Sequence, residues 1–479
     1  MADTLDVDLC VIGGGSGGLS VAAGASQMGA RVALVEKHKM GGDCLNYGCV
    51  PSKSLLAAAH AAEAQRRPGA FGVAPHAPAV DWAGVHAHVH GVIAAIAPVD
   101  SAERFTGLGV TVILGAARFA GPREVIATTA AGETRIRAKW IVIATGSRAA
   151  VPPVPGLGTV PFLTNETIFE RKTAPEHLVI VGGGPIGLEM AQAHRRLGAR
   201  VSVLELGTIL PKDDPELVEV VRRRLVAEGV ALFEQTRVLR VEKRGAGIAA
   251  EIERAGRREF VEGSDLLVAA GRAANVDGLD LDAAGIAYTK RGVTVDAHLR
   301  TTNRRVFAIG DAAGGYQFTH VAGWHAGIVI RQMLFRLFWT KADARAVPWV
   351  TFTDPELAQV GLSEAGARQR YGEVRVLRWS FHENDRAQAE RATEGSIKVV
   401  CTRKGRILGA AIVGRSAGEL IHPWVLAVAN RMKVSLLASY IAPYPTLGEA
   451  GKRAAGSFYT PALFSARTRR IVRFLMRFA

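Results

Sequence analysis

Short hydrophobic runs that end in glycine or another small residue recur along the first two thirds of the chain. They fall at residues 8–12, 31–35, 140–144, 178–181, 200–204, 266–270 and 306–309. Apolar runs of this length, bounded by turn residues, predict buried strands. Stretches of helical length follow the first and fourth runs, and this alternation predicts an α/β fold with parallel sheets.

The pattern changes after residue 348, where the glycine turns stop. Strand-like runs of alternating polarity, at residues 396–401 and 408–413, precede a helical stretch at 418–432. This shift predicts a C-terminal α+β domain that differs from the two α/β units before it. A chain of 479 residues is long enough for about three domains.

Two glycine turns join a predicted strand to a predicted helix in nearly the same way. The first contains Gly13, Gly15, Ser16, Gly17 and Gly18, and the second contains Gly182, Gly184, Ile186 and Gly187. In both units a glutamate, Glu36 or Glu205, ends the next strand 18 residues after the last glycine. This order of elements predicts a dinucleotide site with pyrophosphate at the helix N-terminus. The chain therefore predicts two bound dinucleotides.

Glu205 bears on which nicotinamide nucleotide the second unit binds. A carboxylate there accepts hydrogen bonds from ribose hydroxyls and repels the 2′-phosphate of NADP. We therefore predict that NADH is favoured. Arg200, at the start of that strand, and Lys212, just after it, leave NADPH open as the alternative.

Two cysteines, Cys44 and Cys49, lie five residues apart shortly after the first glycine turn. A redox-capable pair beside a nucleotide cofactor predicts electron transfer between that cofactor and a disulfide. Cys49 begins a predicted helix over residues 50–60, and both the helix dipole and Lys53, one turn on, are expected to lower its pKa. Cys10 and Cys401, in or at the end of buried strands, are expected to be inert thiols.

The charge of the chain and its targeting segments bear on its partners and on its cellular location. The net charge is +15, but the basic residues are scattered without a nucleic-acid-binding motif, so we expect no nucleic-acid partner. We find no signal peptide, and no uninterrupted apolar run reaches the roughly 20 residues needed to span a bilayer. Four cysteines, without a second pair or a Cys/His cluster of zinc spacing, predict a cytoplasmic protein with no metal site.

Together these motifs resemble the flavin-dependent pyridine nucleotide-disulfide oxidoreductases, the group of dihydrolipoamide dehydrogenase, glutathione reductase and mercuric reductase. The resemblance covers residues 6–460 and rests on the cysteine segment, both glycine turns, and residues 144–146, 310–311, 352–356 and 360–361. It implies FAD on the first turn, NAD(P)H on the second, and a homodimer. The implied domains are an FAD domain (1–150), an NAD(P) domain (151–272), a second FAD or central segment (273–345) and a dimerisation domain (346–479).

The resemblance also implies a set of binding residues for each cofactor. The FAD set is Gly13, Gly15, Ser16, Gly17, Gly18, Glu36, Lys37, Gly42, Asp43, Lys53, Ala144, Thr145, Gly146, Gly310, Asp311, Thr319 and His320. Within it, Asp311 is implied to contact the ribityl chain, while Thr319 and His320 bring backbone N–H groups to the flavin ring. The NAD set is Gly182, Gly184, Ile186, Gly187, Glu205 and Gly271.

Catalytic roles follow from the same resemblance. Cys49 is implied to lie against the flavin, and Cys44 to exchange with the substrate. Lys53 is implied to pair with Glu189 near flavin N5, an arrangement that would tune the flavin.

The C-terminal region departs from the pattern of the disulfide reductases. Those enzymes usually carry a His-Pro-Thr segment followed by a glutamate, and the histidine is a general base supplied by the partner subunit. Here Tyr444 stands at the histidine position, and Glu449 is present. A phenol with an ordinary pKa of about 10 is a poor base at neutral pH. Tyrosine here resembles mercuric reductases, but those also use a C-terminal cysteine pair, and no cysteine follows Cys401.

The electron acceptor is therefore open at this point. The leading hypothesis is a flavoenzyme similar to mercuric reductases that passes electrons from NAD(P)H through a Cys44–Cys49 disulfide to a metal ion, a disulfide or a quinone. Dihydrolipoamide dehydrogenase is the alternative enzyme. A different class of function is a flavin-dependent redox sensor or a membrane-docked interaction protein.

The last segment, residues 464–478, is basic and amphipathic and extends past the region of resemblance. Such a helix could lie on an anionic membrane surface as a peripheral contact. The alternatives are a helix that packs on the protein's own surface and a frayed tail.

Overall fold

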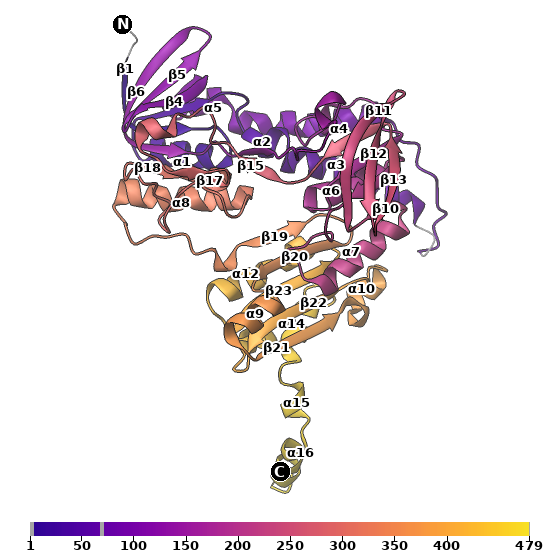
Figure 1. The fold of residues 1–479 in the computed structure, drawn as a ribbon. Coiled ribbons are helices and arrows are strands. Elements are labelled where there is room, and N and C mark those ends of the chain that lie inside the picture. Colours follow the sequence, from indigo (N-terminus) through magenta and orange to yellow (C-terminus); the bar gives the residue numbers. More distant parts are fainter. Residues whose placement is uncertain (1–3, 68–70, 479) are drawn as a thin grey trace.

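Three main sheets, of seven, four and five strands, lie in the molecule together with smaller sheets and a projecting C-terminal helix (Figure 1). The computed structural model describes residues 4–67 and 71–478. The first two sheets lie beside each other, and the third sheet lies below them (Figure 1). The α/β class and the C-terminal α+β unit that the sequence predicts are both present.

The first sheet has a parallel core with an antiparallel extension. Its strands are β1 (Thr4–Ile12), β2 (Val32–Glu36), β3 (Val110–Leu114), β4 (Ala116–Gly121), β5 (Glu124–Thr129), β6 (Gly132–Ile143) and β18 (Val306–Ala308). The order is β3-β2-β1-β6-β5-β4, with β18 also on β6. Strands β1, β2, β3, β6 and β18 pair in parallel with one another, whereas β5 pairs antiparallel with both β6 and β4. Helices α1 (Ser16–Gln27) and α8 (Thr319–Phe335) pack together against this sheet.

The second sheet repeats the parallel pattern with four strands. They are β8 (His177–Val181), β9 (Arg200–Leu204), β10 (Val230–Phe233) and β14 (Asp265–Val268), in the order β10-β9-β8-β14. Its helices are α6 (Pro185–Arg196) and α7 (Pro215–Ala227), and an antiparallel sheet of β11 (Thr236–Arg244), β12 (Gly247–Arg254) and β13 (Arg257–Gly263) adjoins it. The chain leaves the first sheet and returns to it through the antiparallel pair β7 (Ser147–Ala149) and β15 (Arg272–Ala274).

The third sheet is antiparallel and buried on both faces. Its strands are β19 (Pro348–Thr351), β20 (Glu356–Gly361), β21 (Val374–Ser380), β22 (Ser396–Thr402) and β23 (Ile407–Gly414), in the order β19-β20-β23-β22-β21. Every residue of β23 is buried, so the alternating pattern predicted for this strand is wrong. Ala411 and Val413 join the core that includes α7, while Ala410 and Ile412 join a core with α12 (His422–Ala429) and α14 (Glu449–Gly456). Because helices cover both faces, neither set of side chains faces water.

The remaining helices are mostly short. They are α2 (Gly42–Asn46), α3 (Cys49–Arg66), α4 (Trp82–Ile96), α5 (Ala102–Gly107), α9 (Glu364–Tyr371), α10 (Asp385–Ala389), α11 (Ala417–Leu420), α13 (Val434–Ser439), α15 (Thr460–Leu463) and α16 (Ala466–Leu475). The helix predicted over 418–432 is divided between α11 and α12, and the helix predicted over 50–60 is longer than expected.

One helical run among the described residues, Trp82–Gly107, is long and apolar enough to cross a membrane by length and composition. Three histidines and Asp100 interrupt this run, so it is not an uninterrupted apolar stretch of the kind that the sequence was expected to lack. The run joins α4 and α5 through a 3₁₀ turn (Ala97–Asp100) that contains a proline and an aspartate. Within it, Val89 is buried in the same core as residues of α3.

Helices α15 and α16 project away from the body of the molecule (Figure 1). No residue of α16 is buried in the chain. The alternative expectation, that this helix packs on the chain's own surface, does not describe this arrangement.

Candidate active site

A single large cavity joins the two glycine turns. Its volume is about 1730 Å³, above the roughly 300–1,000 Å³ of an ordinary ligand pocket, so it has room for more than one ligand. It lies at the carboxyl ends of the parallel strands, where open α/β sheets bind their ligands. Residues of the third sheet, among them Trp349 and Val350 of β19, also line it.

The first glycine turn is shaped by two close approaches of backbone. Gly13 has a φ of +111°, and a Cβ there would lie 2.4 Å from the carbonyl oxygen of Ala144. A Cβ on Gly18 would lie 1.9 Å from the carbonyl oxygen of Gly13. Only glycine lets α1 pack this closely on β1 and on the end of β6.

The second glycine turn repeats this geometry. Gly182 has a φ of +116°, and its Cβ would lie 2.4 Å from the carbonyl oxygen of Ala269. A Cβ on Gly187 would lie 2.0 Å from the carbonyl oxygen of Gly182. The two units therefore share their structure as well as their sequence spacing.

The two acidic residues at the strand ends also occupy matching positions. Glu36 accepts hydrogen bonds from the N–H groups of Gly14 and His38, both at 2.6 Å. Glu205 accepts from the N–H groups of Gly183 at 2.6 Å and Gly207 at 2.8 Å. Both carboxylates line the cavity beside a glycine turn, where a ribose would lie.

Both turns fit a dinucleotide. The helix that follows each turn starts at a glycine N-cap, Gly15 or Gly184, and neither helix has a side-chain cap. The first N–H groups of α1 and α6 are therefore without intrahelical partners and available to a pyrophosphate. A Cβ on Gly184 would meet nothing within 4 Å, so the space above this turn is open.

The predicted cofactor residues converge on this cavity with two exceptions. Every member of the FAD and NAD sets lines it except Gly18 and Gly187, which lie under the turns and allow the close packing described above. Thr319 is the first residue of α8, as expected for a helix start. His320, next to it, lies 2.9 Å from the carbonyl oxygen of Pro348 through Nε2.

Cys44 and Cys49 face each other across the start of α3. Cys49 is the first residue of the helix, and its Sγ lies 3.5 Å from the hydroxyl of Thr319. The pKa of Cys49 is lowered to about 6, first by a hydrogen bond from Cys44 and then by Thr319 and the charge of Lys53. The pKa of Cys44 is raised by the same pairing and by burial. Cys49 is therefore the thiolate of the reduced pair at neutral pH.

The lowered pKa agrees in direction with the sequence prediction but differs in its main cause. The helix dipole and Lys53 were the causes expected from the sequence. The structure adds the two hydrogen-bond donors, Cys44 and Thr319, and the Cys44 bond is the largest contribution. Thr319 lies 270 residues from Cys49 in sequence, so local patterns could not reveal its contact.

Lys53 and Glu189 form the ion pair that the resemblance implies. The Nζ of Lys53 lies 2.8 Å from Oε2 of Glu189, which is almost completely buried. The N–H of Phe352 donates to Oε1 of Glu189 at 3.0 Å, and the Lys53 ammonium lies 4.3 Å from the centroid of the Phe352 ring. Phe352 therefore holds both members of the pair, a role the sequence analysis missed.

Arg272 is a second residue that the sequence analysis missed. Its guanidinium donates to the hydroxyl and the carbonyl of Ser147, at 2.7 and 2.9 Å, and pairs with Asp43 at 3.1 Å. Ser147 in turn donates to Asp311, and burial raises the pKa of that carboxyl. Asn165 donates to Asp43 at 3.0 Å. The only sequence signal was Arg272 directly after Gly271 at the end of a buried strand.

Tyr444 and Glu449 lie outside this cavity. Tyr444 is 70% exposed, and its hydroxyl donates to Asp385 at 3.0 Å. This carboxylate raises the pKa of Tyr444 above its usual value. Glu449, at the start of α14, pairs with Arg453. The chain does not bring these two residues to its own cysteines, which accords with a role in a partner's site.

Two family models match most of the chain. Residues 7–326 match the pyridine nucleotide-disulphide oxidoreductase family, and residues 347–455 match its dimerisation domain. The chain belongs to this family, as the motifs predicted. The dimerisation domain supports a homodimer.

Similar proteins include enzymes of two kinds. The chain is 35% identical to a mercuric reductase of Streptomyces lividans, over 94% of this chain and 96% of the relative. It is 32% identical to a dihydrolipoyl dehydrogenase of Bacillus subtilis (strain 168), over 92% and 96%. Among solved structures it resembles LpdA of Mycobacterium tuberculosis, with a TM-score of 0.86 and 29% identity over 94% of this chain and 99% of that one.

A second solved structure is the Cu(II) complex of RclA, an HOCl-induced flavoprotein disulfide reductase of Escherichia coli. Its TM-score is 0.84 at 26% identity, over 94% of this chain and 99% of RclA. These findings define an enzyme that uses FAD and NAD(P)H and passes electrons from NAD(P)H through FAD to a redox disulfide.

Proposed function

We propose that this enzyme reduces a thiophilic metal ion, with Cys44 and Cys49 as the redox pair and NADH as the electron donor. FAD, when bound, would relay electrons from the nicotinamide to the cysteines. The observation that carries the proposal is the contrast between Cys49 and Tyr444. The lowered pKa of Cys49 makes it a thiolate at neutral pH. At the position of the usual general base, by contrast, Tyr444 is exposed and its pKa is raised.

Metal reduction suits this contrast because it needs thiolates but no proton abstraction from a thiol substrate. A disulfide substrate would require proton transfers that a positioned base accelerates by about 10²–10⁴. Thiolates are preferred ligands for soft ions. The relatives include mercuric reductases and a Cu(II) complex of a disulfide reductase, which supports the same acceptor class.

The electrons balance for either ion. With Hg²⁺, one NADH yields NAD⁺, H⁺ and metallic mercury. With Cu²⁺, one NADH reduces two ions to Cu⁺ and again releases one proton. In both cases the chain's own contribution is to bind the ion through Cys44 and Cys49 at the wall of the cavity.

The surroundings of Glu205 support NADH as the donor. Its carboxylate lies at the carboxyl end of β9, beside the second glycine turn. Arg200 lies at the opposite end of β9 and pairs with Glu176 at 2.8 Å, so it is not directed at the nucleotide. Lys212 lines the cavity and is the residue to examine if NADPH is used.

An acceptor panel tests this function. Purified holoenzyme is supplied with NADH and with Hg²⁺, Cu²⁺, oxidised lipoamide, oxidised glutathione, a quinone or oxygen. We expect sustained NADH oxidation with a metal ion, lost in Cys44→Ser and Cys49→Ser. Lipoamide turnover faster than turnover with either metal ion would instead establish the dihydrolipoamide dehydrogenase alternative, and no turnover with any acceptor would favour a redox sensor.

We further propose that α16 docks on an anionic membrane surface from the cytoplasmic side. Its exposed apolar side chains include Ile471, Phe474 and Leu475. The segment also carries the arginines Arg467, Arg469, Arg470, Arg473 and Arg477. Apolar side chains combined with this many cations complement a bilayer that contains anionic lipids.

Vesicle sedimentation tests the docking. The full chain should bind vesicles that contain phosphatidylserine, and bind phosphatidylcholine vesicles weakly. Replacing Arg469, Arg470 and Arg473 with glutamine should abolish binding without changing flavin content. Equal binding to both vesicles, or a change of oligomeric state in the variant, would instead assign α16 to a contact between protein chains.

A further inference from the structure

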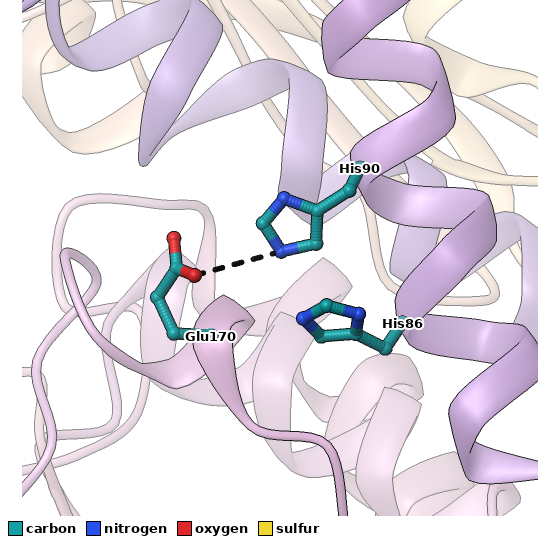
Figure 2. A group of neighbouring side chains, drawn as sticks. All are labelled: His86, His90 and Glu170. Atoms are coloured by element: carbon teal, nitrogen blue, oxygen red, sulfur yellow. Dashed lines mark ion pairs between the residues drawn. The ribbon is translucent and has the colours of Figure 1, made fainter.

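Two histidines and a glutamate converge on one point outside the cofactor cavity. His86 and His90 are one turn apart on α4, and Glu170 ends the 3₁₀ turn Ile168–Glu170. One potential ligand atom from each residue lies within 4.8 Å of the other two. Figure 2 shows both imidazole rings and the carboxylate directed into the same gap between α4 and that turn.

The positions of the two histidines follow from helix geometry. Residues four apart lie on the same face of a helix, one above the other. The ring centroids are 4.2 Å apart. Nε2 of His90 lies 3.8 Å from Glu170 Oε2 and 3.1 Å from the carbonyl oxygen of Phe169.

His86 carries an unsatisfied polar atom. Its Nε2 is buried and has no hydrogen-bond partner. Buried polar atoms are almost always paired, so an unpaired ring nitrogen that faces a second imidazole calls for a ligand.

We propose that His86, His90 and Glu170 bind a divalent transition metal ion, and that Zn²⁺ fits them best. Two imidazoles and one carboxylate are borderline ligands of the kind that Zn²⁺ takes in three-residue sites. A fourth position stays open for water or for the Phe169 carbonyl. Small side-chain rotations would bring the three ligand atoms to the roughly 2.0–2.2 Å from the ion that zinc requires.

The site would connect α4 to a wall of the active cavity. Ile168 and Phe169, in the same 3₁₀ turn as Glu170, both line that cavity. A metal bound here would therefore fix the turn against α4 and brace this part of the wall. The site is independent of the cysteine pair, since its nitrogen and oxygen ligands are less suited to soft ions than thiolates are.

No metal site was predicted from the sequence, because no second cysteine pair or Cys/His cluster in it has zinc spacing. The spacing of His86 and His90 was a usable signal, since it puts two imidazoles on one helix face. The third ligand comes from a separate segment, which no local pattern indicates.

Calorimetric titration of oxidised, untagged holoenzyme with Zn²⁺ tests the proposal. Oxidation keeps Cys44 and Cys49 in a disulfide that cannot compete for the ion. We expect one ion per chain and a rise in the thermal unfolding midpoint when Zn²⁺ is added. His86→Ala and His90→Ala should each weaken binding by about tenfold or more, and Glu170→Gln should weaken it less.

His88→Ala is the matched control, because His88 is exposed on the same helix between the two ligands. It should bind Zn²⁺ like the native protein. Flavin content and the unfolding midpoint without metal show whether each variant is folded. Native-like Zn²⁺ affinity in folded His86→Ala and His90→Ala, or no binding by the native protein, would overturn the proposal.

Discussion

The four cysteines differ in what surrounds their sulfur atoms. Burial raises the pKa of Cys10 to about 12 and that of Cys401 to about 11, so both stay protonated. Cys49, with hydrogen-bond donors and a nearby lysine, has a pKa of about 6. The surroundings of each sulfur atom therefore distinguish the reactive thiol of Cys49 from the inert thiols of Cys10 and Cys401. The sequence had predicted that these two would be inert.

This difference predicts the pH dependence of the reduced enzyme. The thiolate of Cys49 should persist down to about pH 6, because the lowered pKa keeps the charged form present above that pH and loses it below. An anaerobic pH titration of the long-wavelength absorbance between thiolate and flavin measures the midpoint. Cys44→Ala, which removes the main hydrogen-bond donor, should move the midpoint upward, whereas Cys49→Ser should abolish the band. A midpoint near the ordinary thiol value of about 8.5 in the native enzyme would contradict this assignment.

Tyr444 gives the second prediction at this scale. If it occupies the base position of a partner's site, Tyr444→His should raise weak lipoamide turnover by up to about 10²-fold, provided that Glu449 orients the new imidazole. Steady-state kinetics with NADH and lipoamide would measure the change. Tyr440→His is the matched control, because the Tyr440 hydroxyl donates to Gly448 in the same segment. Equal gains in both variants would show that position 444 has no special role.

At the scale of elements, different glycines of the second turn serve packing and ligand binding. A Cβ on Gly187 would collide with Gly182, whereas one on Gly184 would meet nothing. Gly187→Ala should therefore lower stability by about 1–3 kcal/mol. Gly184→Ala should unfold like the native protein yet raise the KM for NADH, because it fills the space where a pyrophosphate would lie. Urea denaturation and initial rates measure the two effects, and a KM unchanged in Gly184→Ala would argue against a dinucleotide there.

The sequence predicted those features of the site that depend on a single helix or strand and the turn beside it. Both glycine units, their glutamates and the start of α8 lie in short segments, so local spacing was enough to predict them. Contacts between distant segments were not accessible in this way. Lys53 and Glu189 were paired only through the family resemblance, while no role was predicted for Arg272 or Phe352. Their partners lie in other domains, and no periodic pattern records such contacts.

Burial on both faces of β23 was missed for a related reason. The strand is rich in small apolar residues, and its sequence does not show that helices of two domains cover it. Only the docking of α7 against the third sheet makes both faces core.

At the scale of the whole molecule, Lys398 joins the third sheet to the start of α7, a helix of the second sheet. It is almost fully buried on β22, with Asp214 at 2.8 Å and Glu216 and Glu364 both at 3.0 Å. Removing one partner of a buried ion cluster typically destabilises a protein by about 3–5 kcal/mol. We expect the destabilisation caused by Lys398→Met to lie near the lower end of this range, because Glu216 and Glu364 are partly exposed. Urea denaturation measures the loss, with exposed Lys404→Met as a control that should behave like the native protein.

The same cluster predicts how stability depends on acid. Hydrogen bonds from Arg378 and Lys398 lower the pKa of Glu216 to about 2. A lowered carboxyl pKa stabilises the fold above the unfolded value of about 4.3, and this contribution disappears as the pH falls toward 2. Lys398→Met should therefore lose less stability than the native protein between pH 5 and about 2. An identical acid profile for both proteins would show that the cluster does not link the domains energetically.

The central claim is that electrons reach the Cys44–Cys49 pair quickly and leave it for a metal ion rather than for a disulfide substrate. Rapid mixing of holoenzyme that has been reduced with NADH, against Cu²⁺ or Hg²⁺ in one experiment and oxidised lipoamide in another, measures this directly. We predict that the reduced pair is reoxidised by the metal ion within the time of one steady-state turnover, and by lipoamide about 10²-fold more slowly. Reoxidation by lipoamide at the rate of flavin reduction by NADH, with no reaction of the metal ions, would contradict the claim.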